Sequence, residues 1–326
     1  MARFSVTDAA TSGFGVIRRE PLAVLVWGVL VLLVFVLPLI GLSWGLVSQS
    51  VGLFKSAAAQ SATTAPGADA DMMAQMMRLQ SQIIGLDLIG ALFGVSLYAV
   101  IGGAVFRSLL EPERRGFFFL RVGQQELWLA LLFLTEVILA YIVMIVGMLL
   151  VMLLAGLGYA IGSSGGSTAG RAVASLIGVV GGLGVFGALV WAGLRLSMAA
   201  PLTFIDRQFR LFESWDFTRG QSWRLLGMFV LVALIIFGLE LVLYGGLGLG
   251  VLAVGSGMVA NLQALEHQPP EAWMRALLPI FAVMGVAGAF IWAGLATLIF
   301  APVATAYRDL RASASNPSPA VISAEA

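Results

Sequence analysis

The sequence contains no cysteine, a single histidine (His267) and few charged residues. Without cysteine the chain forms no disulfide bond and offers no ligand for an iron–sulfur cluster or a cysteine-based zinc site. A lone histidine falls short of the three or four protein ligands that zinc prefers. The sequence also lacks a Walker loop, a dinucleotide fingerprint, a serine–histidine–aspartate set and a metalloprotease helix. We therefore expect no metal, no cofactor and no enzymatic activity.

Charge is balanced as well as scarce. Charged residues make up 11% of the chain and the formal net charge is +1, so no strongly basic surface points to nucleic acid. Apolar residues make up 60%, and the mean hydropathy is +0.99. Soluble domains are roughly 45–50% apolar and roughly 25% charged. Most of this chain is therefore expected to lie in membrane lipid, so lipid is its predicted binding partner. The sequence does not identify any protein partner.

Uncharged runs long enough to cross a bilayer recur along the chain. A spanning helix needs about 20 apolar residues, and six segments reach this length. The first run, Leu22 to Val47, has 26 uncharged residues, which exceeds the roughly 7–15 residues of a signal-peptide core. We expect it to be a span and the protein to be an all-α integral membrane protein. The predicted spans are 22–47, 84–106, 127–160, 172–205, 224–258 and 275–306.

Lysine and arginine are unevenly divided between the links that join these spans. The two termini and the links after the second and fourth spans carry 14 of the 18 residues, and the remaining links carry four. Because cytoplasmic links are enriched in lysine and arginine, we expect both termini to be cytoplasmic. The larger group is Arg3, Arg18, Arg19, Arg107, Arg114, Arg115, Arg121, Arg195, Arg207, Arg210, Arg219, Arg224, Arg308 and Arg311. The smaller group is Lys55, Arg78, Arg171 and Arg275.

Residues 187–207 and 288–308 are two copies of one helical segment. They read GALVWAGLRLSMAAPLTFIDR and GAFIWAGLATLIFAPVATAYR, and they align without a gap with nine identities in 21 positions. Each contains Ala-Pro followed by an arginine six residues after the proline. A repeated membrane helix indicates tandem hairpins that enter the bilayer from the same side.

We expect one six-span domain over residues 1–311, built from three hairpin units, and a disordered tail over 312–326. The units are about 1–110, 111–206 and 207–311. A short amphipathic stretch opens each unit, and we expect it to form a helix at the cytoplasmic surface of the bilayer. These stretches are about 4–20, 113–125 and 207–222.

Four arginines are candidate contacts for lipid headgroups: Arg207, Arg210, Arg219 and Arg308. Three of them belong to the 207–222 stretch, in which aromatic residues are interspersed with charged ones; this composition suits the headgroup boundary. Arg207 and Arg308 occupy equivalent positions in the repeat. The simpler interpretation of that pair is a proline kink that turns the helix out of the membrane while the arginine extends to the phosphate level.

Glu136, Arg195 and Glu240 are the candidate polar site inside the membrane. A carboxylate in hydrocarbon is costly unless it is protonated, paired or hydrated, so it usually faces the interior of a helix bundle. Arg195 lies at about the depth of Glu136, which allows an ion pair between them. The functional interpretation is a pathway for protons or substrate, and the structural one is an ion pair or protonated acid that holds helices together.

Two motifs resemble a known membrane-domain family. The first, ESWDFTRGQSWR over residues 213–224, contains Ser-Trp-x-x-Thr-x-Gly-x-x-Trp-Arg, and the second, YRDLR over 307–311, follows the last span. Together they are similar to the membrane-domain family associated with glycerophosphoryl diester phosphodiesterases and its YciC-like stand-alone relatives, mainly over residues 190–311. The resemblance implies the membrane domain alone, because this chain has no room for the family's catalytic barrel and lacks its histidines. No catalytic residue follows from it.

We therefore expect a non-enzymatic, multi-pass protein of a bacterial-type inner (plasma) membrane that organises lipid or partner proteins. The alternative is a small-molecule or lipid transporter that uses the carboxylates of Glu136 and Glu240. A lipid-modifying enzyme would need clustered polar residues at the membrane surface. Asp206, Glu213 and Asp216 are the candidates for that role, although solvated charges on a link explain them more simply.

Overall fold

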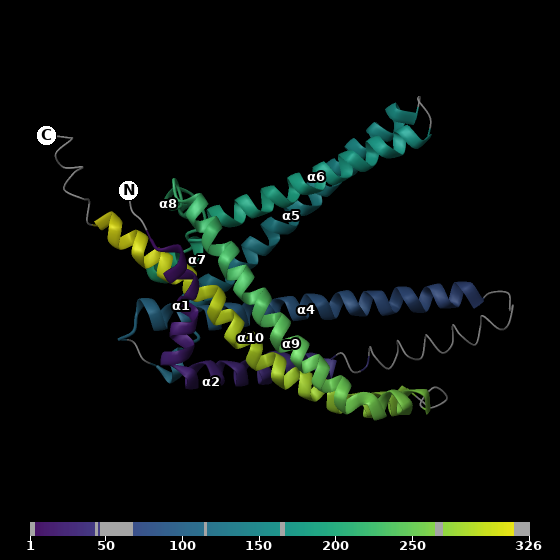
Figure 1. The fold of residues 1–326 in the computed structure, drawn as a ribbon, viewed down its shortest axis with the longest axis horizontal. Coiled ribbons are helices and arrows are strands. Elements are labelled where there is room, and N and C mark those ends of the chain that lie inside the picture. Colours follow the sequence, from purple (N-terminus) through teal and green to yellow (C-terminus); the bar gives the residue numbers. More distant parts are fainter. Residues whose placement is uncertain are drawn as a thin grey trace. The chain divides into compact units, whose positions relative to one another are not determined.

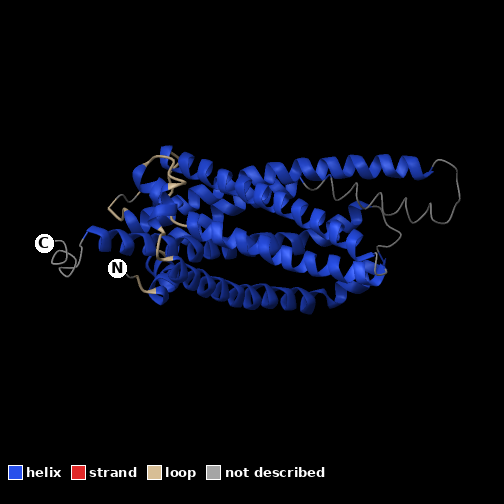
Figure 2. Cartoon of the chain, turned by 90° about the horizontal axis from the view of Figure 1, so that it is seen from above, coloured by secondary structure: helices blue, strands red, loops and turns tan. Residues whose placement is uncertain are grey.

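The structure is a computed structural model that describes residues 4–42, 45, 68–113, 116–163, 167–264 and 270–315. Every regular element in these ranges is a helix (Figures 1 and 2). In chain order they are α1 (Val6–Arg19), α2 (Pro21–Val31), η1 (Leu32–Val36), α4 (Ala68–Leu110), η2 (Phe117–Phe119), α5 (Gln124–Gly162), α6 (Ser167–Leu196), α7 (Ala199–Asp206), α8 (Glu213–Phe217), α9 (Ser222–Ala264) and α10 (Pro270–Ser315). His267 and residues 316–326 of the predicted 312–326 tail lie outside the described residues, and residues 312–315 are the last of α10.

Six helical segments of the described chain are long and apolar enough to cross a membrane, which confirms the prediction of an all-α protein with six spans. They are Pro21–Leu42, Met76–Leu110, Phe117–Gly162, Thr168–Asp206, Ser222–Gly250 and Leu278–Ser313. The helices that carry them are long: α4 has 43 residues, which at 1.5 Å per residue is about 65 Å. A bilayer core is only about 30 Å thick, so α4 extends beyond the hydrocarbon region.

The chain divides into two compact units. Unit 1 comprises Met1–Ala9, Val122–Phe229 and Val303–Ala326, and unit 2 comprises Ala10–Arg121 and Val230–Pro302. Both units are made of segments that are distant in sequence, so each is held together by tertiary packing. The division into three tandem hairpins stays a prediction.

In unit 1, α5 and α6 lie side by side as an antiparallel hairpin joined by a short link (Figure 1, teal). Glycines let the two backbones meet at the closed end of the hairpin. A Cβ atom on Gly162 would lie 2.8 Å from the Gly170 Cα, and one on Gly170 would lie 2.8 Å from the Tyr159 carbonyl oxygen. Further along, a Cβ on Gly147 would lie 2.6 Å from a methyl group of Val185. The hairpin is therefore packed through small residues, as in other membrane helix pairs.

In unit 2, aromatic side chains of α4 pack against α10. The Tyr98 ring centroid lies 5.7 Å from that of Trp292 and 4.6 Å from that of Phe300. The Phe106 and Phe300 rings meet edge to face at 5.5 Å. Gly102 makes room for this contact, because a Cβ there would lie 2.9 Å from the Phe300 ring. Edge-to-face and tilted pairs of this kind are favourable beyond the area they bury.

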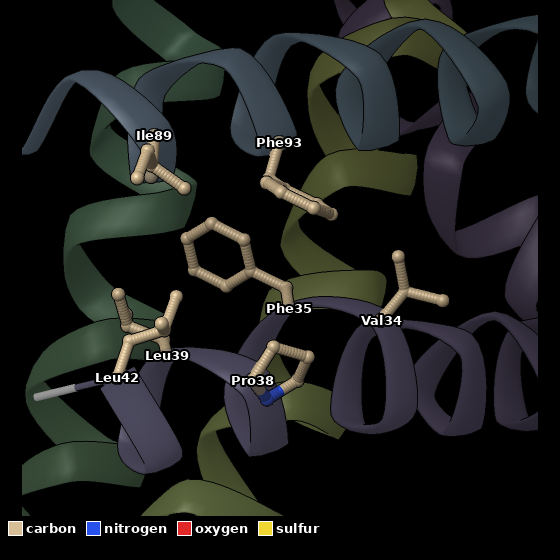
Figure 3. A pocket seen from close by; sticks show the side chains of 8 residues that line it. Val34, Phe35, Pro38, Leu39, Leu42, Ile89 and Phe93 are labelled. Carbon is tan, nitrogen blue, oxygen red and sulfur yellow. The ribbon is translucent and has the colours of Figure 1, made fainter. Parts of the chain in front are cut away.

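A proline shapes the first span. Pro38 has no N–H to offer the carbonyl four residues earlier, which is that of Val34, and the chain forms the π-helical turn η1 around this carbonyl. Figure 3 shows the apolar groove beside this turn, in which Phe35 and Phe93 face each other from η1 and α4. The groove has about 290 Å³ of empty space. Its lining is Val34, Phe35, Pro38, Leu39, Leu42, Ile89, Gly90 and Phe93, which offers no polar side chain.

The three amphipathic stretches adopt different structures. The first forms the regular helix α1, whose Gly13 packs so closely on α10 that a Cβ would lie 2.8 Å from the Leu298 Cα. In the described part of the second, the helical element before α5 is the single 3₁₀ turn η2, in which Phe118 and Phe119 have positive φ angles of 49° and 60°. The third forms the five-residue helix α8. Only the first is therefore long enough to lie on a membrane surface as an amphipathic helix.

Candidate functional site

The helix of the fourth span is broken near its arginine-rich end. α6 ends at Leu196 and α7 begins at Ala199, with a two-residue turn between them. Pro201 favours a break at this position. A proline lacks the N–H that would bond the carbonyl four residues earlier, and its ring collides with that carbonyl, which here belongs to Ser197. The backbone groups around the turn therefore need other hydrogen-bond partners.

Two hydroxyl groups from the following link provide those partners. Ser214 Oγ donates to the Arg195 carbonyl over 2.7 Å and accepts the Met198 N–H over 3.1 Å. Thr218 Oγ1 lies 3.4 Å from the same carbonyl and 3.2 Å from that of Trp215, and its single hydrogen can be donated to either. Both side chains are completely buried. The bonds fix α8, which carries Ser214, against the end of α6.

Further hydrogen bonds within unit 1 fold the link back onto its helices. Arg207 ends α7 in the left-handed conformation, with a φ of 54°, and the chain reverses there. The Arg210 N–H then donates to Thr203 Oγ1 over 3.1 Å. On the other side of α7, Gln125 Nε2 of α5 donates to the Phe204 carbonyl over 3.0 Å. The segment from α6 to α8 is therefore a defined structure and not a loose connection.

The Arg195 side chain stacks on two tryptophans. Its guanidinium carbon lies 5.9 Å from the Trp191 ring centroid and 5.6 Å from that of Trp215. The two rings pack edge to face with their centroids 4.7 Å apart. Arginine over the face of tryptophan is the most favourable cation–π pair in proteins. Trp191 comes from α6 and Trp215 from α8, so this cluster also joins the link to the end of the span.

Arg195 has no carboxylate partner among the residues that the structure describes. Its Nε and Nη1 atoms are enclosed and form no hydrogen bond within the described part of the chain. The ion pair with Glu136 that a similar depth allows is not formed, because the guanidinium turns to the tryptophans instead. Glu136 lies half-buried on α5 in unit 1, and Glu240 lies half-buried on α9 in unit 2. The three residues of the predicted intramembrane site are therefore not shown to act together.

The four arginines predicted to contact headgroups differ in their ion pairs. Arg210 lies 3.4 Å from Asp206 and 3.1 Å from Glu213. The other two pairs are Arg219 with Asp216 at 3.9 Å and Arg308 with Asp309 at 3.5 Å. Arg207 is exposed and forms no ion pair with any described residue. Exposed pairs of this kind are worth about 0–1 kcal/mol, so three of the four charges are balanced by pairs that a ligand could easily displace.

The carboxylate of Glu213 is held in its charged form. A hydrogen bond from its own backbone N–H lowers the pKa of Glu213, and the hydrogen bond and charge of Arg210 lower that pKa further. Glu213 lies in the first turn of α8, where a negative charge is also favoured by the helix dipole. The pair with Arg210 therefore persists at neutral pH and makes the link less cationic than its arginine count suggests.

Large aromatic side chains remain exposed beside these charges. Trp223 at the start of α9 is 85% exposed and Phe212 in the link is 73% exposed. Neither contributes to packing inside the unit. Tryptophan and phenylalanine next to arginine are typical of the boundary between lipid and water. The link thus presents apolar rings and guanidinium groups together on one short segment.

Unit 2 contains a second anchored link, which sequence reasoning did not identify. Trp27 Nε1 donates to the Phe118 carbonyl over 3.0 Å, and the buried side chain of Arg107 donates to the Phe119 carbonyl. These carbonyls belong to η2. The only signal in the sequence is a triple phenylalanine near an arginine, and neither indicates a hydrogen bond 91 residues apart in the chain.

The described residues contain no group of three or more histidine, cysteine, aspartate or glutamate side chains that could hold a metal ion. Comparisons with protein-family models, with curated proteins and with solved structures find no match for this chain. The resemblance to the glycerophosphoryl diester phosphodiesterase membrane-domain family rests on the two motifs alone and stays a prediction. The structure gives the first of these motifs a local role, since Ser214, Trp215 and Thr218 are its contacts to the end of α6.

Proposed function

We propose that this chain is a non-enzymatic membrane protein that binds phospholipid headgroups and thereby organises lipid or partner proteins in the bilayer. The binding segment, called here the 195–224 link, runs from the end of α6 through α7 and α8 to the start of α9. The observation that carries the proposal is the composition of the exposed surface of that link. Trp223 and Phe212 are largely exposed, and the Arg219 side chain nearby is 80% exposed. A fixed segment that presents rings and guanidinium groups together is suited to the headgroup layer.

The proposal includes a location and an orientation. We place the protein in a bacterial-type inner membrane with both termini in the cytoplasm, on the distribution of lysine and arginine. The repeat of residues 187–207 in 288–308 supports an origin by duplication of helical hairpins. In this arrangement the 195–224 link faces the cytoplasmic leaflet, whose anionic lipids attract basic segments.

The lipid that accompanies the protein tests the proposal. We expect full-length protein extracted in a mild detergent to retain phospholipid that is richer in anionic headgroups than the membrane it came from, measured by mass spectrometry of the co-purified lipid. The double variant Arg207→Gln and Arg219→Gln should lower that enrichment, because two exposed charges of the link are lost. Co-purified lipid with the same composition as the source membrane would count against the proposal.

A transporter is the alternative function. It is favoured by two carboxylates, Glu136 and Glu240, that lie within membrane-spanning helices, since ionisable groups at this depth often belong to substrate or proton pathways. Proton-coupled uptake into proteoliposomes should then be abolished by Glu240→Gln. Wild-type uptake in that variant would remove Glu240 from the mechanism.

A further inference from the structure

We propose that Arg195 is a binding site for one phosphate group, presented by the headgroup of an anionic phospholipid. The inference rests on the proposed function, because it names the residue and the ligand chemistry at the same link. Arg195 is a cation that the fold fixes in position and that forms no ion pair with any described residue. The sequence predicts an intramembrane polar site that joins it to Glu136; in the structure it is the last but one residue of α6, beside the segment that leads to α8.

Arg195 differs from neighbouring arginines in lacking a carboxylate partner among the described residues. Arg210, Arg219 and Arg308 each have a carboxylate within 3.1 to 3.9 Å. Arg195 has none among the described residues, and two of its guanidinium nitrogens are enclosed. A guanidinium that is partly removed from water is costly unless an anion accompanies it. Arg195 is the last but one residue of α6, in the half of the span Thr168–Asp206 that ends at Asp206, and a long arginine side chain can extend from there toward the phosphates of lipid headgroups.

The Arg195 side chain is held in position before any ligand binds. The carbonyl of Arg195 is fixed by Ser214 and Thr218, and its guanidinium is fixed by stacking on Trp191 and Trp215. A long, flexible side chain is thus already held in one place. Binding of a ligand therefore costs little side-chain conformational entropy, which favours affinity. Arginine suits this role better than lysine because its planar group stacks on aromatic rings while it donates to phosphate.

The three guanidinium nitrogens of Arg195 differ in their access to a ligand. Nε and Nη1 are enclosed beside the tryptophan rings. The remaining nitrogen, Nη2, forms no hydrogen bond within the described part of the chain and is not among the enclosed atoms. It is the donor that a phosphate oxygen can reach. The contact is therefore a single charge-assisted hydrogen bond at one nitrogen, and not the two-pronged contact that an unobstructed guanidinium makes.

The test compares lipid binding by variants of the full-length protein. Native mass spectrometry in detergent gives the fraction of protein that carries added phosphatidylglycerol. We expect Arg195→Gln to weaken that binding roughly tenfold, because a hydrogen bond to a charged group is lost. Arg311→Gln is the matched control: it removes the same charge from the same unit, but its guanidinium bonds the Tyr307 hydroxyl and not a ligand. This control should bind as the wild type does.

Arg195→Lys keeps the test decisive if the glutamine variant does not fold. It retains the charge at the end of the span but loses the planar stacking, and we expect it to bind phosphatidylglycerol roughly threefold more weakly. Diacylglycerol, which has the same acyl chains and no phosphate, should bind all folded variants equally. If excess inorganic phosphate displaces phosphatidylglycerol from the wild type, the site recognises the phosphate itself; if it does not, the lipid is required as well.

Two outcomes would overturn the assignment of Arg195. One is wild-type affinity for both phosphatidylglycerol and inorganic phosphate in Arg195→Gln, or in Arg195→Lys where only that variant folds. The other is an equal loss in Arg311→Gln, which would indicate a general effect of charge. Either result leaves the proposed function intact as long as wild-type protein retains anionic lipid. Absence of that lipid from the wild type would instead contradict the proposed function.

Discussion

Ser214 donates one hydrogen bond and accepts another at the broken end of α6, and it does so in complete burial. A buried hydroxyl in this position bonds two backbone groups, the Arg195 carbonyl and the Met198 N–H, that the break between α6 and α7 leaves without helical partners. Trp215, next in sequence, stacks on Arg195. Neighbouring residues of one motif therefore fix the backbone and the side chain of the same arginine.

Ser214→Ala tests this role. The substitution leaves the Arg195 carbonyl with only the longer bond from Thr218 and leaves the Met198 N–H without its acceptor. We expect the free energy of unfolding to fall by about 1–3 kcal/mol, as for other buried polar groups that lose their partner. Helical circular dichroism during unfolding by sodium dodecyl sulfate in mixed micelles measures the change.

The control for that variant is Ser313→Ala. Ser313 also donates a hydrogen bond, over 2.8 Å to the Asp309 carbonyl, but this bond lies within the last turns of α10 and connects no second element. We expect its loss to change the stability by less than about 0.5 kcal/mol. Equal effects of the two substitutions would contradict a special role for Ser214.

At the scale of the element, the two copies of the repeat fold differently. The first copy is interrupted before Pro201, whereas α10 continues through Pro302 to Ser315. Proline is present in both, so proline alone does not decide the break. The first copy is followed by a link that supplies Ser214 and Thr218 to the freed backbone groups. The second copy has no such link among the described residues, and its helix continues.

The α5–α6 hairpin gives an element-scale prediction. Gly170→Ala places a methyl group 2.8 Å from the Tyr159 carbonyl oxygen, which forces the two backbones apart at the closed end. We expect a loss of about 1–3 kcal/mol, the usual effect of overpacking, measured by the same unfolding assay. In Gly178→Ala, the control on the same helix, the new methyl group meets no atom within 4 Å.

The Gly178→Ala control separates the effect of helix propensity on stability from the effect of the close contact at Gly170. Alanine is a better helix former than glycine by about 1 kcal/mol, so Gly178→Ala should preserve or raise stability. Gly170→Ala receives the same benefit and should still be destabilised. If both variants gain stability, the close approach of α5 and α6 does not limit the packing of the hairpin.

At the scale of the whole molecule, sidedness is the property that the function depends on. The chain has no cysteine, so single cysteines can be introduced and labelled without removing any. Ser163 lies at the closed end of the α5–α6 hairpin and Arg219 lies in the link after α7. Both are exposed, which makes them suitable positions.

We expect a membrane-impermeant maleimide to label Ser163→Cys in intact cells and to label Arg219→Cys only after the membrane is opened. The expectation follows from the distribution of lysine and arginine and from the 39-residue length of α5, which is ample to span a bilayer. Detergent-treated cells, in which both positions should react, provide the control. Labelling of both positions from the same side of an intact membrane would contradict the proposed topology.

Hydropathy alone gave the class of protein and the six spans, because a helix in lipid satisfies its own backbone and needs only apolar side chains of sufficient length. This signal is local, and it is strong in a chain that is 60% apolar. The same local reasoning placed candidate arginines in the 207–222 stretch. It could not rank them, since the sequence does not show which carboxylate pairs with which arginine.

Tertiary structure alone decided the rest. It placed Arg195 over Trp191 and Trp215 and in no ion pair with Glu136, because a side chain's partner depends on contacts between separate elements and not on its depth along one helix. In the described part of the 113–125 stretch it revealed the 3₁₀ turn η2, anchored by Trp27 and Arg107. The spans follow from the solvent that each segment prefers, whereas the site depends on hydrogen bonds and stacking between residues that the sequence separates.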